Sequence, residues 1–424
     1  MADPRHAPMI EPVPAPDSMG RRRVRTAKRV KVKKVVCTIG TRPEAIKMAP
    51  IISALGEASW ADCRVLLTAQ HRELVDDALA VFEIVPDIDL DAMRPGQTLV
   101  DLTARLLGAV SESLSREAPD LVLAQGDTTT VLATALACYY LKIPFGHVEA
   151  GLRTGRLDAP FPEEGNRLVA GRLSAVHFAP TASARDNLLR EGVDPTTIHV
   201  TGNTVIDALL ATARREMPIG VDLEPSSRVV LVTAHRRDSF GRPLRRICRA
   251  VAEILRRHPD VEVLWPLHPN PAVRPVVEEV LSGHPRAHLC GPLPYGAFVA
   301  ALKRSHIVLT DSGGVQEEAP ALGKPVLVLR AESERPEALE AGLARLVGTD
   351  PRVIIKEADR LLSDPDAYRA MARGASPYGD GHAAARIVDG IARLLGVSHP
   401  SDEQVKLSPR VSGRHPHPGS RNRC

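Results

Sequence analysis

Short runs of β-branched and other apolar residues alternate with segments of helical periodicity from residue 32 onward. Six of these runs precede Asp207: "VKVKKVVCTIG", "CRVLLTA", "DLVLAQGD", "IPFGHVEAG", "AVHFAPT" and "TIHVTGN". Six more follow it: "RVVLVTAHRR", "VEVLWPLHPN", "AHLCGPLP", "HIVLTDSGG", "KPVLVLRA" and "LARLVGTD". Each run is typical of a buried parallel strand that leads into a helix. The pattern therefore predicts an α/β protein with two Rossmann-like, doubly wound parallel sheets.

The two series of strands define the expected domains. We expect a first Rossmann-like domain over residues 33–203 and a second over 204–377, with disordered ends at 1–32 and 397–424. Ligands of such sheets bind at the carboxyl ends of the strands, so the cleft between the domains is the expected site. The segment 378–396 is an amphipathic helix that needs a docking surface, which periodicity alone does not identify. Its apolar face is expected to carry Ile387, Val388, Ile391, Leu394 and Leu395.

Composition and charge exclude several classes of protein. No apolar run approaches the ~18 residues that cross a bilayer. The six cysteines are scattered without a C-x-x-C pair, which favours reduced thiols in a cytoplasm. Residues 1–34 carry a net charge of +7 and residues 398–424 a net charge of +3, so the +4 of the whole chain leaves −6 for the core. A nucleic-acid-binding core is therefore not expected, and the basic N-terminal run is interpreted as a solvated extension or a misassigned start.

Concentrated polar chemistry follows several of the predicted strands. "GTRPEAIKMAP" places Arg42 and Lys47 at the start of a helix, where they either attract an anion or form a solvated first turn. In "QGDTTT", Asp127 is either a helix N-cap or a group of the site. Glu149 ends an apolar strand, where an ionised side chain is costly unless it is paired or used in chemistry.

Two further segments offer proton-handling and anion-binding groups. "PFPEEGNR" contributes Glu163, with Glu164 and Arg167 close by; the simple interpretation of Glu164 is a partner of the helix dipole. "TAHRRDSFG" places His235 and two arginines after a strand, as surface charge or as a grip on a phosphate with a proton-transfer group.

The stretch "TDSGGVQEEAPALGKP" predicts a phosphate site. Ser312, Gly313 and Gly314 can turn without Cβ clashes and direct backbone amides at an anion, with a helix beginning at Val315. Glu318 is then placed for ribose hydroxyls, and Arg335 in "RAESERPE" for the phosphates. Since both the G-x-G-x-x-G fingerprint and the G-x-x-x-x-G-K-[ST] loop are absent, a sugar nucleotide is a better candidate than a nicotinamide or a kinase substrate.

Nine motifs together resemble the bacterial non-hydrolysing UDP-N-acetylglucosamine 2-epimerases. They are "GTRPEAIKMAP", "QGDTTTVLATALA", "GHVEAGLRTG", "PFPEEGNR", "VTGNTVIDAL", "VTAHRRDSFG", "PLHPNP", "LTDSGGVQEEAPALGKPVLVLR" and "ERPEALEAGLARLVGTD", in the family's order between Lys33 and Gly396. The resemblance implies a glycosyltransferase-B-like pair of domains, a homodimer, and a final helix that returns to the first domain. It also implies interconversion of UDP-GlcNAc and UDP-ManNAc without NAD or metal.

The resemblance assigns expected roles motif by motif. The catalytic groups would be Asp127, Glu149, Glu163 and His235. Substrate contacts would be Arg42, Lys47, Phe298 beside the uracil, Ser312, Gly313, Gly314, Glu318 and Arg335. Some family members are activated by a second substrate molecule at a segment that matches Gln70, His71 and Arg72, so an allosteric site is a further hypothesis.

The chemistry of the reaction explains the need for such groups. The C2 proton of the sugar is not acidic until UDP leaves C1; its loss then gives a glycal, which is re-protonated from the other face before UDP returns. A firm grip on UDP and carboxylates that handle the proton and the developing positive charge are therefore required.

Some positions depart from the family pattern, and three alternatives stay open. Ala69 stands where Gly is common, Asp238 and Ser239 where Glu-Asn is usual, Leu293 where a Gln can occur, and Gly96 where several members carry an arginine. The alternatives are an epimerase of a related UDP-2-acetamido sugar such as a diacetamido uronic acid, a glycosyltransferase on the same scaffold, and a non-catalytic UDP-sugar sensor. The clustered acids disfavour the glycosyltransferase, and the complete set of motif-matched residues disfavours the sensor.

Overall fold

The computed structural model describes residues 31–69, 72–94, 96–234, 236, 239–333 and 335–397, without the side chains of 72–74. From Val32 onward the chain forms one compact unit that contains two parallel sheets. Among the described residues, no helix is long and apolar enough to cross a membrane.

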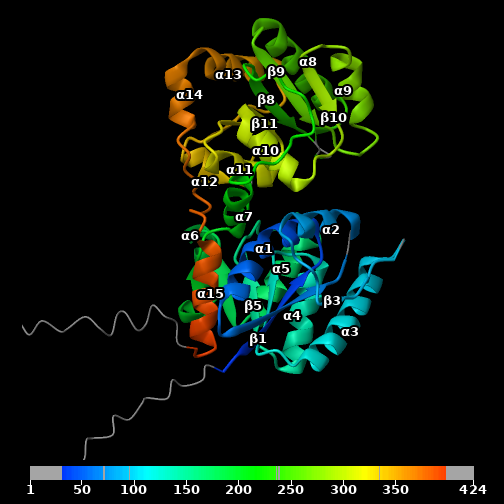
Figure 1. Ribbon diagram of the computed structural model, residues 1–424, viewed down its shortest axis with the longest axis vertical. Helices are drawn as coiled ribbons and strands as arrows, with labels where there is room; N and C mark the ends of the chain where they lie inside the picture. The colour runs from blue at the N-terminus through cyan, green and yellow to red at the C-terminus, as the bar shows by residue number, and fades with distance from the viewer. Residues whose placement is uncertain are drawn as a thin grey trace, which may run out of the picture. The chain divides into compact units, whose positions relative to one another are not determined.

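The first sheet has seven strands in the order β3-β2-β1-β4-β5-β6-β7, all parallel. The strands are β1 Lys33–Ile39, β2 Ala61–Leu67, β3 Ile88–Asp89, β4 Leu121–Gln125, β5 Phe145–Val148, β6 Val176–Ala179 and β7 Ile198–Val200. The helices are α1 Arg42–Glu57, α2 Arg72–Val81, α3 Leu99–Glu117, α4 Thr129–Leu141, α5 Glu163–Leu173, α6 Ala182–Arg190 and α7 Thr204–Ala213, with a 3₁₀ turn at Pro195–Thr197. Figure 1 shows these elements in blue to green.

The second sheet has six parallel strands in the order β10-β9-β8-β11-β12-β13. The strands are β8 Arg228–Thr233, β9 Val261–Pro266, β10 Ala287–Cys290, β11 Ser305–Thr310, β12 Val326–Val328 and β13 Ala344–Leu346. The helices are α8 Arg242–Arg257, α9 Arg274–Leu281, α10 Tyr295–Arg304, α11 Gly313–Ala321, α12 Pro336–Glu340, α13 Pro351–Ser363, α14 Pro365–Met371 and α15 Ala383–Leu394.

Both sheets reverse their strand order between the third and the fourth strand of the order given above, which confirms the predicted doubly wound fold. The reversal lies between β1 and β4 in the first sheet and between β8 and β11 in the second. All twelve predicted strands are present. The prediction lacked β3, whose two residues at the sheet edge are too short to give a periodic signal.

The last helix, α15, packs against α1 and α7, beside the first sheet (Figure 1). Ile387, Val388 and Ile391 are buried as predicted. The placement of Leu394 on the buried face was wrong, because it is 42% exposed. Leu395 at the C-cap packs against the core, as predicted. Two amides at the start of α15 donate to the Asp207 carboxylate, from Ala384 at 2.9 Å and Ala383 at 3.2 Å.

The chain passes between the two sheets twice, and the two passages touch. The first follows β7 through Asn203 and α7, which contacts α1 on one side and α10 and α11 on the other. The second runs from α14 to α15 and includes Tyr378, whose carbonyl oxygen accepts a hydrogen bond from the backbone N of Asn203 at 2.6 Å.

Candidate active site

A cavity of about 630 Å³ is lined by strand ends and helix starts from both sheets. Arg42 and Lys47 of α1 line it together with Glu318 of α11 and with Arg335. Phe298 of α10 lines it as well. The cavity therefore lies where parallel sheets bind ligands.

The start of α1 is fixed by the buried side chain of Glu44. Its Oε2 accepts hydrogen bonds from the backbone N of Gly40 at 2.5 Å and of Thr41 at 2.7 Å, and its Oε1 accepts one from the Thr128 hydroxyl at 2.5 Å. Burial raises the pKa of Glu44 to about 7, although these hydrogen bonds act in the opposite direction. One carboxyl group thus joins the turn that carries Arg42 to the turn that carries Asp127.

Glu149 lies at the centre of a buried polar network. It follows β5 with a φ of +61°, which is unusual for a residue with a side chain. Lys47 Nζ lies 2.7 and 2.8 Å from its two carboxylate oxygens, and the amides of Gln125 and Asn203 donate to it as well. Burial alone would raise the pKa of Glu149, but Lys47, Arg335 and Asn203 together lower it below the usual value. Glu149 is accordingly held as an ionised group.

A second ion pair of the network belongs to the second sheet. The guanidinium of Arg335 donates to Glu317 Oε1, and the Asn203 amide donates to Glu317 Oε2 at 2.9 Å. Glu317 raises the pKa of Arg335 far above the usual value. Burial would lower the pKa of Lys47, but Glu149 and Glu317 raise it. Two cations and two carboxylates therefore balance one another beside the cavity.

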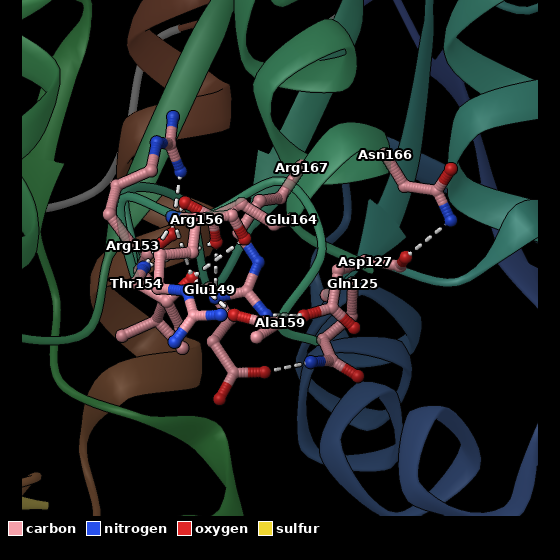
Figure 2. A network of polar contacts seen from close by, with 12 residues as sticks. Gln125, Asp127, Glu149, Arg153, Thr154, Arg156, Ala159, Glu164, Asn166 and Arg167 are labelled. Carbon is pink, nitrogen blue, oxygen red and sulfur yellow. Dashed lines mark hydrogen bonds and ion pairs between the residues drawn. The ribbon is translucent and has the colours of Figure 1, made fainter. Parts of the chain in front are cut away.

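Asp127 belongs to a separate chain of contacts, shown in Figure 2. Arg167 Nη2 lies 2.7 Å from Asp127 Oδ2, and the Asn166 amide donates to the Asp127 carbonyl oxygen at 2.8 Å. Burial raises the pKa of Asp127, while Arg167 opposes this rise. The N-cap interpretation of Asp127 was wrong, because Thr128 caps α4 by accepting a hydrogen bond from Val131 N.

The two glutamates at the start of α5 have different surroundings. Glu164 is 1% exposed and accepts hydrogen bonds from the backbone N of Thr154 and Gly155 at 3.0 to 3.1 Å (Figure 2). The interpretation of Glu164 as a simple dipole partner therefore misses that it holds a loop. Glu163 Oε2 is buried without a hydrogen-bond partner in the described part of the chain, which leaves it available to a substrate group.

The glycine turn after β11 differs from the expectation in one respect. Helix α11 begins at Gly313, two residues before the predicted Val315, with Ser312 as its N-cap residue. Neither Gly313 nor Gly314 has a positive φ, and a Cβ at Gly314 would have no atom of the described residues within 4 Å. Their lack of side chains thus leaves the helix N-terminus open to an anion rather than permitting a special backbone turn.

Glu318 is buried near the same end of α11. The Tyr295 hydroxyl lies 3.4 Å from Glu318 Oε1. Burial, with Glu317 nearby, raises the pKa of Glu318 to about 7. A carboxyl group with a pKa near 7 can accept hydrogen bonds from the hydroxyls of a ligand in the cavity when it is ionised, and can donate one to them when it is protonated.

Several expected residues lie outside the described residues. These include His235, Gln70 and His71, and the side chain of Arg72 is not described. Near His235 in sequence, the backbone N of Arg236 and the Ser239 hydroxyl donate to Asp311 Oδ2 at 3.0 and 2.8 Å. Ser239, a departure from the family pattern, thus makes a buried hydrogen bond.

A second departure carries a conformational cost. Ala69 has a φ of +54°, a region that favours glycine and costs other residues roughly 1–2 kcal/mol. Glycine at position 69 would adopt this φ without the strain.

Several members of the site were not predicted from the sequence. Asn203, Glu317 and Gln125 were not singled out, and Arg167 was noted only as a neighbour. All four lie in the quoted motifs, and Gln125 and Asn203 stand near the ends of runs predicted as strands. For these two residues the position at a strand end was the available signal, whereas Glu317 and Arg167 lie within helices.

Comparisons with known proteins agree with this geometry. The model of the UDP-N-acetylglucosamine 2-epimerase family matches residues 53–392. The chain is 50% identical over 365 residues to a UDP-N-acetylglucosamine 2-epimerase of Yersinia pestis, covering 84% of this chain and 97% of that protein. It is 49% identical over 368 residues to that of Escherichia coli K12, covering 84% and 98%.

A solved structure shares the fold as well as the sequence. The UDP-GlcNAc 2-epimerase of Neisseria meningitidis, solved with UDP-GlcNAc bound, aligns with a TM-score of 0.77 and 44% identity over 85% of this chain and 100% of that chain. The chain belongs to the UDP-N-acetylglucosamine 2-epimerase family.

Proposed function

We propose that the protein interconverts UDP-N-acetylglucosamine and UDP-N-acetylmannosamine by eliminating UDP and adding it back through a glycal. Membership of the family supports this proposal. The observation that carries it is the ion pair between Glu149, a buried and ionised carboxylate, and Lys47, 2.7 Å away, which lines a cavity of nucleotide-sugar size.

UDP is proposed to occupy the part of the cavity that the second sheet lines. The open N-terminus of α11 and the guanidinium groups of Arg42 and Arg335 provide donors for a diphosphate. The buried carboxyl of Glu318 suits the ribose hydroxyls, and the Phe298 ring offers an apolar surface to the base. These groups would hold UDP after it has left the sugar, which the return step requires.

The proposed reaction starts with cleavage of the bond between C1 and the phosphate oxygen. The bonding electrons leave with UDP, and a carboxylate takes the C2 proton, so that a C1–C2 double bond forms. Delivery of a proton to the other face of C2 and return of UDP to C1 complete the inversion. Carboxylates beside the sugar also stabilise the positive charge that develops at C1.

The carboxylates are proposed to divide the proton transfers between them. Lys47 holds the pKa of Glu149 below its usual value despite burial, whereas burial raises the pKa of Asp127, so Glu149 ionises more readily than Asp127. On this basis Glu149 is proposed to take a proton and Asp127 to deliver one. Glu163, whose buried Oε2 has no hydrogen-bond partner among the described residues, and His235 are proposed as further groups at the sugar.

We further propose a homodimer, a cytoplasmic location, and a reaction without NAD or metal, as the resemblance implies. Exposed apolar side chains on the neighbouring helices α4 and α5 support the dimer. Tyr139 and Tyr140 are 62% and 64% exposed, and Val169 is 42% exposed. The allosteric role of the segment at Gln70, His71 and Arg72 stays a prediction.

The function is tested by proton NMR of the purified protein with UDP-GlcNAc in deuterium oxide, without added NAD or metal. We expect UDP-ManNAc to appear with deuterium at C2, since the proton is exchanged with solvent during the reaction. The Asp127→Asn variant is expected to bind UDP without converting the sugar.

Other outcomes would contradict the proposal. If the protein binds UDP but does not convert UDP-GlcNAc, the proposed substrate becomes a UDP-diacetamido sugar, which is tested in the same way. Binding of both sugars without any exchange would instead indicate a sensor. Near wild-type turnover by Asp127→Asn would remove Asp127 from the mechanism.

A further inference from the structure

One amide group lies between the two ion pairs of the network. Asn203 Nδ2 donates to Glu149 Oε1 and to Glu317 Oε2, both at 2.9 Å. Glu149 follows a strand of the first sheet, and Glu317 belongs to a helix of the second. The side chain of Asn203 is therefore a direct polar link between the two sheets.

Every hydrogen-bonding group of Asn203 that points into the protein has a partner. Its Oδ1 accepts from Val205 N at 3.2 Å as the N-cap of α7, and its backbone N donates to the Tyr378 carbonyl oxygen at 2.6 Å. The residue is 4% exposed. Its orientation is thus fixed by both passages of the chain between the sheets.

The amide is needed because of the charges around it. Glu149 and Glu317 are like charges that both approach Nδ2, each with its own cation, Lys47 and Arg335. A side chain with two donor hydrogens satisfies both carboxylates at once, whereas water or a hydroxyl would be less fixed in direction. A carboxylate in the same place would add a third negative charge.

We propose that Asn203 is a positioning residue of the epimerase: its amide holds Glu149 and the Glu317–Arg335 pair at a fixed separation beside the cavity. This inference rests on the proposed function. Arg335 binds the leaving diphosphate and Glu149 acts at the sugar, so the separation sets whether the carboxylate reaches C2 while the phosphate stays held. A displacement of about 1 Å can cost roughly 100-fold in rate without loss of binding.

The test uses two variants that both preserve the helix cap, because Ser and Asp are good N-cap residues. Asn203→Ser removes the link, and we expect kcat to fall roughly 100-fold while the affinity for UDP, measured by calorimetry, stays nearly unchanged. Asn203→Asp keeps the shape but replaces the donors by acceptors. We expect a larger loss of kcat at neutral pH and partial recovery toward acidic pH.

The recovery has a direct physical cause. The new carboxylate contacts Glu149 and Glu317, whose cations are Lys47 and Arg335. Glu318, which interacts with Glu317 and has a pKa of about 7, is present in both proteins that are compared. A proton bound between the new carboxylate and either glutamate restores one hydrogen bond, so activity relative to wild type should rise as the pH falls. A residue that only supports folding would not change the shape of the pH profile.

A matched control separates this effect from a loss of stability. Asp350→Ala removes the N-cap of α13, where Asp350 accepts from Arg352 N at 2.9 Å, and it should lower stability without changing kcat. Wild-type turnover is measured first, since its absence overturns the proposed function and not the role of Asn203. With an active wild type, an Asn203→Ser variant of unchanged kcat, or one whose kcat and UDP affinity fall together, would overturn the positioning role. An Asn203→Asp variant with the wild-type pH profile would overturn it equally.

Discussion

Glu44 shows what a single buried carboxyl group contributes to the site. It is not part of the Lys47–Glu149 or Arg335–Glu317 ion pair. Its carboxyl group accepts hydrogen bonds from the backbone of the Gly40–Thr41 turn and from the Thr128 hydroxyl at the same time. Arg42 and Lys47 follow the Gly40–Thr41 turn in the sequence, and Asp127 directly precedes Thr128. Residues proposed to bind the substrate are thus positioned by a neighbour with no expected contact to it.

The raised pKa of Glu44 makes the stability of the protein depend on pH. Its pKa is about 7 in the folded protein and 4.5 for a glutamate that is exposed to water, as in the unfolded chain. The folded state therefore binds the proton more tightly. The stabilisation is complete below pH 4.5 and is lost as the pH rises to about 7, by on the order of 3 kcal/mol. We expect Glu44→Gln to remove this contribution, because the amide keeps the acceptor for the backbone and can donate to Thr128.

The measurement is the free energy of unfolding in urea at several pH values between 4.5 and 7 for both proteins. Glu318, whose pKa is also raised to about 7, contributes equally to both and cancels in the difference. An identical pH dependence of the two proteins would show that Glu44 is not protonated in this range.

At the scale of the residue, the sequence predicted the groups that lie at strand ends but not the contacts between them. Glu149 was singled out because a carboxylate after an apolar strand needs a partner. Asn203 was missed because its partners lie 54 and 114 residues away, and an Asn before a helix has the simpler explanation of a cap. Pairing between the two sheets has no local signal in the sequence.

Among the elements, α15 depends on a close contact with the first sheet. A Cβ built on Gly390 would lie 2.8 Å from Cε1 of Phe178 on β6, and Phe178 is 1% exposed. Because both the helix and the strand are buried at this point, there is no free space for a methyl group.

We therefore expect Gly390→Ala to destabilise the protein. Overpacking costs typically 1–3 kcal/mol, which exceeds the gain of roughly 1 kcal/mol in helix propensity. Gly108 of α3 is the matched control, since a Cβ there has no atom within 4 Å, and Gly108→Ala should be stabilising. Denaturant unfolding of the two variants checks this. Equal stabilisation by both would mean that α15 does not pack closely on Phe178.

At the scale of the element, twelve strands and their order of appearance were predictable because buried parallel strands are continuous apolar runs. The errors lie at element ends. The first residue of α11 was placed late because Gly313 and Gly314 are poor helix formers, yet both lie in the first turn, where helix propensity matters little. Leu394 fitted the period but lies at the end of the packed surface.

For the whole molecule, the proposed homodimer predicts a mass near twice 45.7 kDa in light scattering. Tyr140→Glu places a charge on the exposed apolar surface of α4 and is expected to shift the mass toward that of one chain. Val85→Glu is the control, because Val85 is 83% exposed and lies in the loop between α2 and β3, outside α4 and α5. A monomeric wild type would contradict the dimer, and a dimeric Tyr140→Glu would contradict this interface.

The two passages of the chain between the sheets have a mechanical consequence. Because Asn203 of the first passage and Tyr378 of the second are joined at 2.6 Å, and Asp207 is bonded to the start of α15, both passages cross at nearly one place. Two adjoining connections that are bonded to each other restrict the relative movement of the two sheets more than a single connection would. If the cavity opens by a movement of one sheet against the other, the residues at this crossing, Asn203 among them, would move least.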